Sequence, residues 1–378
     1  MSDSELQFDS LVVKGKLMSR ALCYRSSWDL SILKIPIPVN INEHQILVRV
    51  KAVSINPIDV LLLRFSLPFL GSRQKVVGGD YSGIVVKAGE KSGFSQGDSV
   101  YGYRLAPMSI NGTFSEYIVV DPTKDIFCDN IPDGMIFEQA ASTPCVAATG
   151  YGILKYGLHK GDNRRIKESV EGALEGKKVF IIGAGTSVGS YAVEFAKKYM
   201  SAAKVVVTCS SRSEQRLEQS GADITINYTD GDAHNVNDIL EFVKLHGKFD
   251  IIVDCVRNYS YMEYLHLILK DPKEGGAYCT VYGVNAMNLY SCSIWSVILP
   301  NYEALKYAVL YAFGYFKFPI YSFKLSYDPT LSSAIRKMWE AKEFQTPIDS
   351  IFRGWTQYDL ALHRVGTSKA SGKVVCII

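Results

Sequence analysis

The sequence predicts an α/β protein built from two domains, and three observations carry this prediction. The chain has 378 residues, enough for two ordinary domains that each bury a core without disulfides or metals. Short alternating strands separated by turn signals fill the chain up to about residue 150, whereas strands alternate with helices after residue 175. A glycine-rich turn joins the first of those later strands to its helix. We therefore expect a partly open β-barrel and a doubly wound parallel sheet.

The barrel prediction depends on runs of alternating apolar residues at 46–53, 84–86 and 117–120. Tight turns are expected between them, because glycine and asparagine tolerate positive backbone angles. The turn candidates are Gly78-Gly79-Asp80, Gly97-Asp98 and Asn111-Gly112.

The parallel sheet is predicted by continuous apolar runs, as expected for strands that helices cover on both faces. The expected strands are 178–182, 204–208 and 249–254, and the expected helices are 188–199 and 214–219. Residues 360–378 again indicate a helix and then a strand, and we expect that last strand to rejoin a sheet.

Composition excludes several classes of protein. The 41 basic residues are interspersed with 38 acidic ones at a net charge of +3, which does not favour nucleic-acid binding. The basic cluster Asn163–Lys167 is interpreted as a solvated loop. Eight cysteines without a C-x-x-C pair disfavour both a disulfide framework and a zinc knuckle. The first residues lack the features of a signal or transit peptide, so we expect an intracellular, reducing compartment.

An aromatic segment, Ser291–Phe323, has few charges. Pro300, Glu303, Lys306, Gly314 and Pro319 interrupt it before any run reaches the roughly 18 apolar residues of a membrane span. We therefore expect no transmembrane helix.

The glycine-rich turn is the main functional motif. Gly183, Gly185 and Gly189 follow the apolar run 179–182, and the turn opens a helix whose first N–H groups, at Ser187 and Val188, would face a pyrophosphate. Thr186 stands where many such turns have their middle glycine, and its side chain would narrow the approach of a cofactor. The alternative is a plain strand-to-helix turn.

The end of the next strand bears on the choice of cofactor. NAD-binding turns place a carboxylate there, about twenty residues after the last glycine, to bind the ribose 2′-hydroxyl. Here the chain has Ser210, Ser211 and Arg212, which suit a 2′-phosphate, so NADPH is favoured over NADH. The alternative is that the two serines only cap a helix that begins near Ser213.

In order and spacing, a series of short motifs resembles the medium-chain dehydrogenase/reductase superfamily, specifically its zinc-free quinone-oxidoreductase-like branch. The motifs are 53–59, 78–83, 97–102, 112–117, 140–144, 149–151, 221–223, 227–228 and 372–375. The resemblance implies a GroES-like catalytic domain at 1–148, a Rossmann domain at 149–328 and a return to the catalytic domain at 329–378.

The chemistry that this resemblance implies is hydride transfer from NADPH to quinones, enones or lipid-derived carbonyls, without zinc. The Gly-His-Glu zinc motif of related alcohol dehydrogenases is replaced by Gly79-Asp80, and no other cluster offers zinc the ligands it needs. By resemblance, Asn56 lies beside the nicotinamide, Thr149 contacts the cofactor and Tyr228 lies near the adenosine phosphate. Asp59 is either a site residue or a structural turn residue.

Some residues depart from this pattern. The sequence has Leu62-Leu63-Arg64-Phe65 and Leu67-Pro68-Phe69 where quinone reductases commonly shape the site with Arg, Gly and Tyr, which predicts a more apolar acceptor pocket.

The aromatic segment is interpreted as an insertion that resembles the fungal Yim-type branch, whose members are associated with lipid droplets and mitochondria. It would contact a lipid surface; a contact between two copies and a lid over the acceptor site are the alternatives. A second hypothesis for the whole chain is therefore a catalytically weak or silent family member that binds a lipid droplet or a protein partner.

Overall fold

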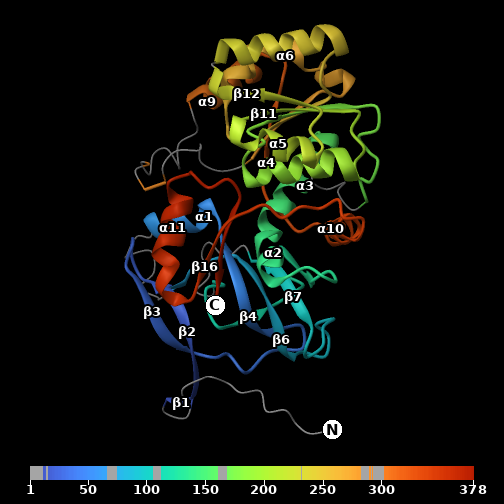
Figure 1. Cartoon of the computed structure of the whole chain (residues 1–378). Helices are drawn as coiled ribbons and strands as arrows, with labels where there is room; N and C mark the ends of the chain where they lie inside the picture. The colour runs from blue at the N-terminus through green and yellow to red at the C-terminus, as the bar shows by residue number, and fades with distance from the viewer. Residues whose placement is uncertain are drawn as a thin grey trace.

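The structure is a computed structural model that describes residues 12–13, 16–65, 75–104, 112–160, 168–230, 232–281, 289–290, 292 and 302–378. Figure 1 shows two domains, one stacked on the other, with helices α2 (Phe137–Ser142) and α3 (Pro144–Leu158) between them. The two-domain α/β architecture expected from the sequence is confirmed.

The first domain contains two sheets, and every strand pair in them except β16–β17 is antiparallel. The small sheet has the order β1-β2-β3, with β5 paired to β2, and the larger sheet has the order β16-β17-β4-β6-β7-β9, with β8 paired to β4. Helix α1 (Pro57–Arg64) directly follows β4. The strands are β1 (Val12–Val13), β2 (Lys16–Tyr24), β3 (Leu30–Pro36), β4 (Ile46–Ile55), β5 (Lys75–Val76), β6 (Asp80–Ala88), β7 (Ser99–Tyr103), β8 (Tyr117–Val120), β9 (Phe127–Asn130), β16 (Ile348–Arg353) and β17 (Lys373–Ile377).

The C-terminal strand completes this first domain. Strand β17 pairs antiparallel with β4 and parallel with β16, so the last residues of the chain lie against residues near position 50. Helices α10 (Leu331–Glu340) and α11 (Tyr358–Gly366) precede the two returning strands. The expected return of the C-terminus to a sheet is therefore observed.

The second domain is a six-stranded sheet in the order β12-β11-β10-β13-β14-β15, and every pair in it is parallel. Its strands are β10 (Lys178–Ile182), β11 (Lys204–Cys209), β12 (Ile224–Asn227), β13 (Ile251–Asp254), β14 (Ala277–Val281) and β15 (Ile320–Phe323). Its helices are α4 (Ser187–Glu194), α5 (Ser211–Ser220), α6 (Asp232–His246), α7 (Leu265–Ile268) and α9 (Tyr302–Ala312).

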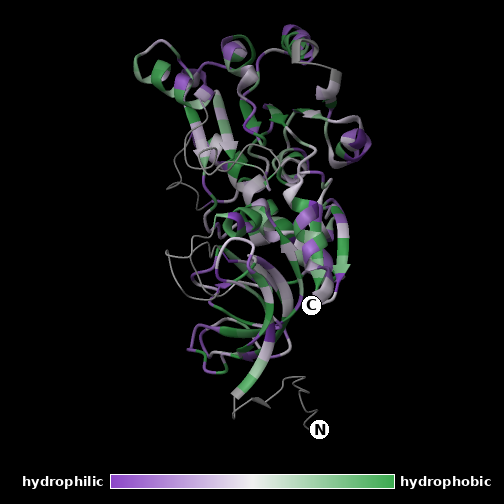
Figure 2. Ribbon diagram, turned by 90° about the vertical axis from the view of Figure 1, so that its left-hand side faces the viewer, coloured by the Kyte–Doolittle hydropathy of each residue, from purple (hydrophilic) through white to green (hydrophobic). Residues whose placement is uncertain are grey.

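The sheet core explains why these strands are continuous apolar runs. Val179 and Ile181 on β10 pack into the cluster that contains α3, whereas Phe180 and Ile182 pack into a second cluster on the opposite face. Both faces are thus covered, and both parities of the strand must be apolar. Figure 2 shows hydrophobic residues along the strands and hydrophilic residues on outward turns of the helices.

Three sequence-based expectations need correction. The helix expected at 188–199 is α4 followed by a π-helical turn, Phe195–Tyr199, and the helix expected at 214–219 already begins at Ser211. The aromatic segment is not an added insertion throughout, because its last residues are β15, hydrogen-bonded to β14. Position 291 and positions 293–301 of that segment, and the basic cluster at 163–167, lie outside the described residues.

No helix in the described ranges has both the length and the apolar composition needed to cross a membrane.

Candidate active site

The glycine-rich turn lies between β10 and α4, and its glycines are required by close approaches. Gly183 has φ +75°, and a Cβ there would lie 2.5 Å from Val256 Cγ1. A Cβ on Gly189 would lie 2.6 Å from both the Cα of Ala184 and the carbonyl oxygen of Gly183. Both positions therefore favour glycine: Gly183 because of its positive φ and the Val256 side chain, and Gly189 because the helix packs against the backbone of the turn.

Thr186 is the N-cap of α4. Its Oγ1 accepts a hydrogen bond from the Gly189 N–H at 3.1 Å and donates one to the Gly183 carbonyl at 2.9 Å. A glycine could make neither bond. The hydroxyl, which was expected to narrow the approach of a cofactor, thus makes two hydrogen bonds within the turn and caps the helix.

The first turn of α4 leaves backbone donors for a ligand. In the part of the chain that the structure describes, the N–H groups of Ser187 and Val188 have no protein acceptor, and both residues are half-buried. Free N–H groups at a helix N-terminus form an anion site, since the helix dipole adds to their partial positive charge. This donor set, together with the glycine cradle, fits the pyrophosphate of a dinucleotide.

Arg216 on α5 holds the glycine-rich turn and the start of α4 by hydrogen bonds, a role that was not predicted from the sequence. Its Nη1 donates to Ser190 Oγ at 2.6 Å, and its Nη2 donates to the Gly185 carbonyl at 3.4 Å. Burial lowers the pKa of Arg216 from its ordinary value. The link between α5 and the turn forms only in the tertiary structure, and no local pattern announces it.

The residues expected at the ribose lie at the ends of neighbouring strands. Ser210, Ser211 and Arg212 follow β11, and Tyr228 follows β12, which pairs in parallel with β11. Ser211, Arg212 and Tyr228 are exposed. Ser210 is the N-cap of α5, which begins two residues before Ser213, but its side chain makes no capping hydrogen bond. The hydroxyl of Ser210 is thus not used as a helix cap.

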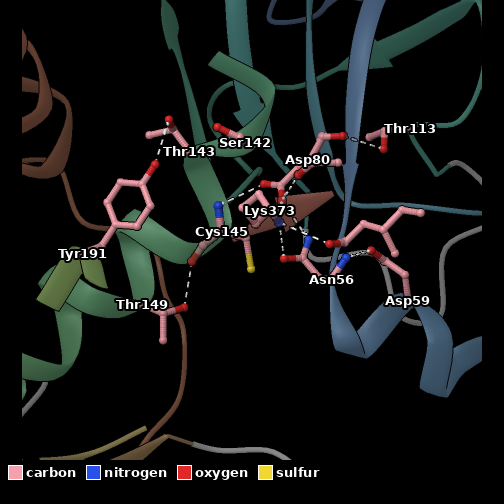
Figure 3. Close-up of polar contacts among 12 residues, drawn as sticks. Asn56, Asp59, Asp80, Thr113, Ser142, Thr143, Cys145, Thr149, Tyr191 and Lys373 are labelled. Carbon is pink, nitrogen blue, oxygen red and sulfur yellow. Dashed lines mark hydrogen bonds and ion pairs between the residues drawn. The ribbon is translucent and has the colours of Figure 1, made fainter. Parts of the chain in front are cut away.

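A buried polar network lies between the two domains, at the ends of β4, β6, α3 and β17 (Figure 3). Asp80 is fully buried and its two carboxylate oxygens accept four hydrogen bonds. The donors are Ser54 Oγ at 2.9 Å, Asn56 Nδ2 at 2.7 Å, the Cys145 N–H at 2.9 Å and Lys373 Nζ at 2.9 Å. Such a carboxylate is held in one orientation.

Lys373 carries the positive charge of this network. Its ammonium, on a side chain that is 3% exposed, donates to Asp80, to Asn56 Oδ1 at 2.6 Å and to the Ile55 carbonyl at 3.4 Å. The three acceptors match the three N–H groups of an ammonium. In the sequence, Lys373 is only one residue of the short motif at 372–375. Its role in the network could not be predicted, because 317 residues separate it from Asn56.

Asp59 lies one helical turn from Asn56, at the start of α1. Its Oδ2 accepts a hydrogen bond from the Asn56 N–H at 2.8 Å, so it has the structural role of a capping residue. Asp59 also lines a cavity, and burial raises the pKa of its carboxyl to about 7. Its two possible roles, turn residue and site residue, are therefore compatible.

The cavity beside Asp59 is lined by aliphatic, aromatic and charged residues and has as much polar as apolar surface. Its lining comprises Tyr24, Ile58, Asp59, Leu62, Val76, Val77, Gly78, Gly79, Tyr103 and Arg104. Burial raises the pKa of both tyrosines, which keeps their phenols protonated. The part of the expected pocket at 67–69 lies outside the described residues.

Contacts connect the cavity side of the network to the glycine-rich turn. Tyr191 on α4 lies 3.3 Å from Thr143 Oγ1, hydroxyl to hydroxyl, and Cys145, two residues further along, binds Asp80. Thr149, on the same helix as Cys145, is half-buried and donates to the Cys145 carbonyl at 2.7 Å. Helix α3 therefore links the expected cofactor turn to the expected catalytic residues (Figure 3).

The residues present do not fit a zinc ion. In the described ranges, no group of three or more His, Cys, Asp and Glu side chains could hold a metal. A Cβ on Gly79 would lie 2.5 Å from the ring of Tyr103, so no imidazole can be accommodated there. Burial raises the pKa of the Cys145 thiol well above its ordinary value, and the Lys373 ammonium already provides the cation beside Asp80.

With this geometry established, comparisons with known proteins define the class. Residues 42–133 match the alcohol dehydrogenase GroES-like domain family, and residues 220–376 match the zinc-binding dehydrogenase family. The quinone oxidoreductase from Coxiella burnetii has a similar fold, with a TM-score of 0.70 at 20% identity over 96% of this chain and 99% of its own. The CurK enoyl reductase has a TM-score of 0.67 at 18% identity over 95% of this chain and 98% of its own.

The chain belongs to the medium-chain dehydrogenase/reductase superfamily, as its motifs suggested. Within it, the chain is 32% identical to protein YIM1 of Vanderwaltozyma polyspora over 88% of this chain and 91% of that protein. Protein YIM1 of Saccharomyces cerevisiae is 28% identical, over 88% of this chain and 90% of its own length. The resemblance to the Yim-type branch is confirmed.

Proposed function

We propose that this protein is an NADPH-dependent, zinc-independent oxidoreductase that reduces quinones, enones or lipid-derived carbonyls. The observation that carries the proposal is the juxtaposition of two parts through α3: an anion-binding turn at Gly183–Gly189 and a buried polar network that ends in Asp59 at a cavity. The class of the fold agrees with it, since the chain is a member of an oxidoreductase superfamily.

The protein residues have a limited task in this reaction. A bound nicotinamide supplies a hydride, which the acceptor takes on one atom while it takes a proton on another. Asp59 is positioned to hold that proton, because it lines the cavity and its pKa of about 7 leaves a large protonated fraction at neutral pH. The apolar and aromatic side chains of the lining would contact a hydrophobic acceptor beside Asp59.

The choice of NADPH over NADH rests on the end of β11. Arg212 is exposed there, at the first turn of α5, and Ser210 and Ser211 offer hydroxyls. The carboxylate in that turn, Glu214, accepts a hydrogen bond from Thr225 Oγ1 at 2.9 Å. A guanidinium binds a 2′-phosphate by charge-assisted hydrogen bonds, whereas NADH offers it only hydroxyls.

Gly185→Asp tests cofactor binding. A side chain at this position would lie 3.0 Å from Ser213 Oγ, so a small one is accommodated by a slight shift, and the variant should fold. The added carboxylate should repel the pyrophosphate and weaken NADPH binding by roughly 100-fold, measured by calorimetric titration with NADPH and, separately, NADH. Turnover with a panel of enones and quinones should fall in parallel.

Gly185→Ala is the matched comparison, since it adds the Cβ without the charge, and it should weaken NADPH binding much less than Gly185→Asp. Unmodified protein that binds neither nucleotide would refute the proposed function. Equal affinity for NADPH and NADH would refute only the assignment of the 2′-phosphate site.

A second candidate function, contact with a lipid surface, is favoured by the outer face of α9. Tyr302, Leu305, Val309 and Phe313 recur at helical spacing, and Tyr302 and Phe313 are each 74% exposed. Tyr315, just beyond the helix, is 82% exposed. Exposed aromatic rings of this kind suit a polar–apolar boundary, where tyrosine keeps its hydroxyl in water.

Phe313→Ser combined with Tyr315→Ser should abolish co-flotation with phospholipid-coated triolein droplets, because two of the most exposed aromatic rings at this face are removed. Tyr327→Ser is the control, as Tyr327 is 61% exposed but lies between β15 and α10, away from α9 and the turn that directly follows it. Droplet binding that survives the double substitution contradicts this role. A loss of self-association in the double variant, measured by light scattering without droplets, would instead assign the face to a second copy.

A further inference from the structure

The Asn56 amide has a fixed orientation in the structure. Its Oδ1 accepts from Lys373 Nζ at 2.6 Å and its Nδ2 donates to Asp80 at 2.7 Å. A reversed amide would set its own N–H groups against the ammonium and its oxygen against the carboxylate. Two charged partners therefore decide which end of this side chain donates.

The same pair of charges is adjacent to Asp59. The charge of Asp59 in turn raises the pKa of Tyr24 on β2, Tyr103 on β7 and Cys145 on α3, and Arg104 lines the same cavity. Asp80 and Lys373 act on Asp59 in opposite directions: the carboxylate raises its pKa and the ammonium lowers it. While both are present, their effects on Asp59 partly cancel.

Lys373 comes from the last strand of the chain, and its hydrogen bonds to Asp80 and Asn56 connect that strand to the site. We propose that Lys373 is a positioning residue for the reaction: its buried ammonium orients the Asn56 amide and balances the charge of Asp80 beside the Asp59 carboxyl. This inference rests on the proposed function. It assigns the fixed positive charge beside Asp80 to a lysine. Among the described residues, no group of three or more His, Cys, Asp and Glu side chains could hold a metal ion in its place.

The test is the pH dependence of turnover in three variants. Lys373→Met leaves Asp80 unbalanced, so the pH at which activity is half lost should rise by about one unit. Asp80→Asn leaves the ammonium unbalanced, so that pH should fall by a similar amount. The double variant removes both charges and should return toward the unmodified profile, although its rate stays low because the Asn56 amide is no longer fixed.

Opposite shifts distinguish positioning from a purely structural role, since a loosened site has no reason to move the profile in two directions. If one single variant does not fold, the direction of the other and the return in the double variant still decide the question. Lys270→Met is the control, because it breaks a 2.7 Å ion pair with Asp250 outside the site and should leave the profile unchanged. NADPH affinity should remain within about twofold in all four variants.

Three folded variants with the unmodified pH profile would overturn the role of Lys373 while leaving the proposed function intact. An unmodified protein without turnover on any acceptor would overturn both.

Discussion

Asp59→Asn should lower turnover by roughly 100-fold or more, because a general acid in the cavity is replaced by an amide that cannot give up a proton. The amide oxygen can still accept the hydrogen bond from the Asn56 N–H, so the start of α1 should be preserved. NADPH affinity should not change. The measurement is steady-state turnover of an enone with NADPH, together with a calorimetric titration.

The pH dependence of the unmodified protein belongs to the same prediction. Burial raises the pKa of Asp59 to about 7, and the proton donor is the protonated form. Activity should therefore be full below pH 7 and should fall about tenfold per pH unit above it, and Asp59→Asn should remove this limb.

Asp98→Asn is a close control for this substitution. Asp98 accepts a hydrogen bond from the Ser95 N–H at 2.8 Å, the same backbone contact over the same spacing, but at an exposed turn. It should leave turnover unchanged. If Asp59→Asn kept both rate and pH profile, Asp59 would be a turn residue only and the proton would come from elsewhere.

Lys155→Met should lower the free energy of unfolding by about 3–5 kcal/mol, because it leaves the largely buried carboxylate of Asp328 without its ion-pair partner. Lys155 on α3 is fully buried, and its Nζ lies 3.0 Å from Asp328 Oδ2 and 2.9 Å from Thr330 Oγ1. Asp328 and Thr330 precede α10, so this ion pair fastens the returning chain to the helix between the domains. Denaturant unfolding followed by circular dichroism measures the loss.

The double variant Lys155→Met with Asp328→Asn should recover part of that stability, since it no longer buries an unpaired charge. Lys337→Met removes an exposed ion pair with Glu171 and should leave the unfolding midpoint unchanged. Equal effects of the Lys155 and Lys337 substitutions would contradict a role for burial.

The parts of the site that depend on local sequence could be predicted. The turn Gly183–Gly189 was found because its glycines, the preceding strand and the following helix are contiguous. The capping role of Thr186 could have been predicted as well, since a threonine directly before the first residue of a helix is a helix-start signal. It was instead interpreted only as a departure from the glycine pattern.

The parts of the site that depend on contacts between distant segments could not be predicted from the sequence. Lys373 and Arg216 are unremarkable in sequence, and their partners Asn56 and Gly185 are far from them along the chain. The last four residues of the aromatic segment could not be assigned to a strand for a related reason. Nothing local distinguishes Ile320–Phe323 from an exposed aromatic run, and only the pairing with β14 makes it a strand of the sheet.

The sequence by itself determined the order of elements, the two-domain α/β class and the place of the glycine-rich turn, because apolar periodicity, turn residues and strand-to-helix junctions are properties of neighbouring residues. Only the tertiary structure decided which charges face one another. Burial makes that decision important: Asp80 and Lys373 are held together in a site with little water, where an unpaired charge would be costly. The polar network beside Asp59 is thus a product of the fold, which brings the last strand of the chain to the end of β4.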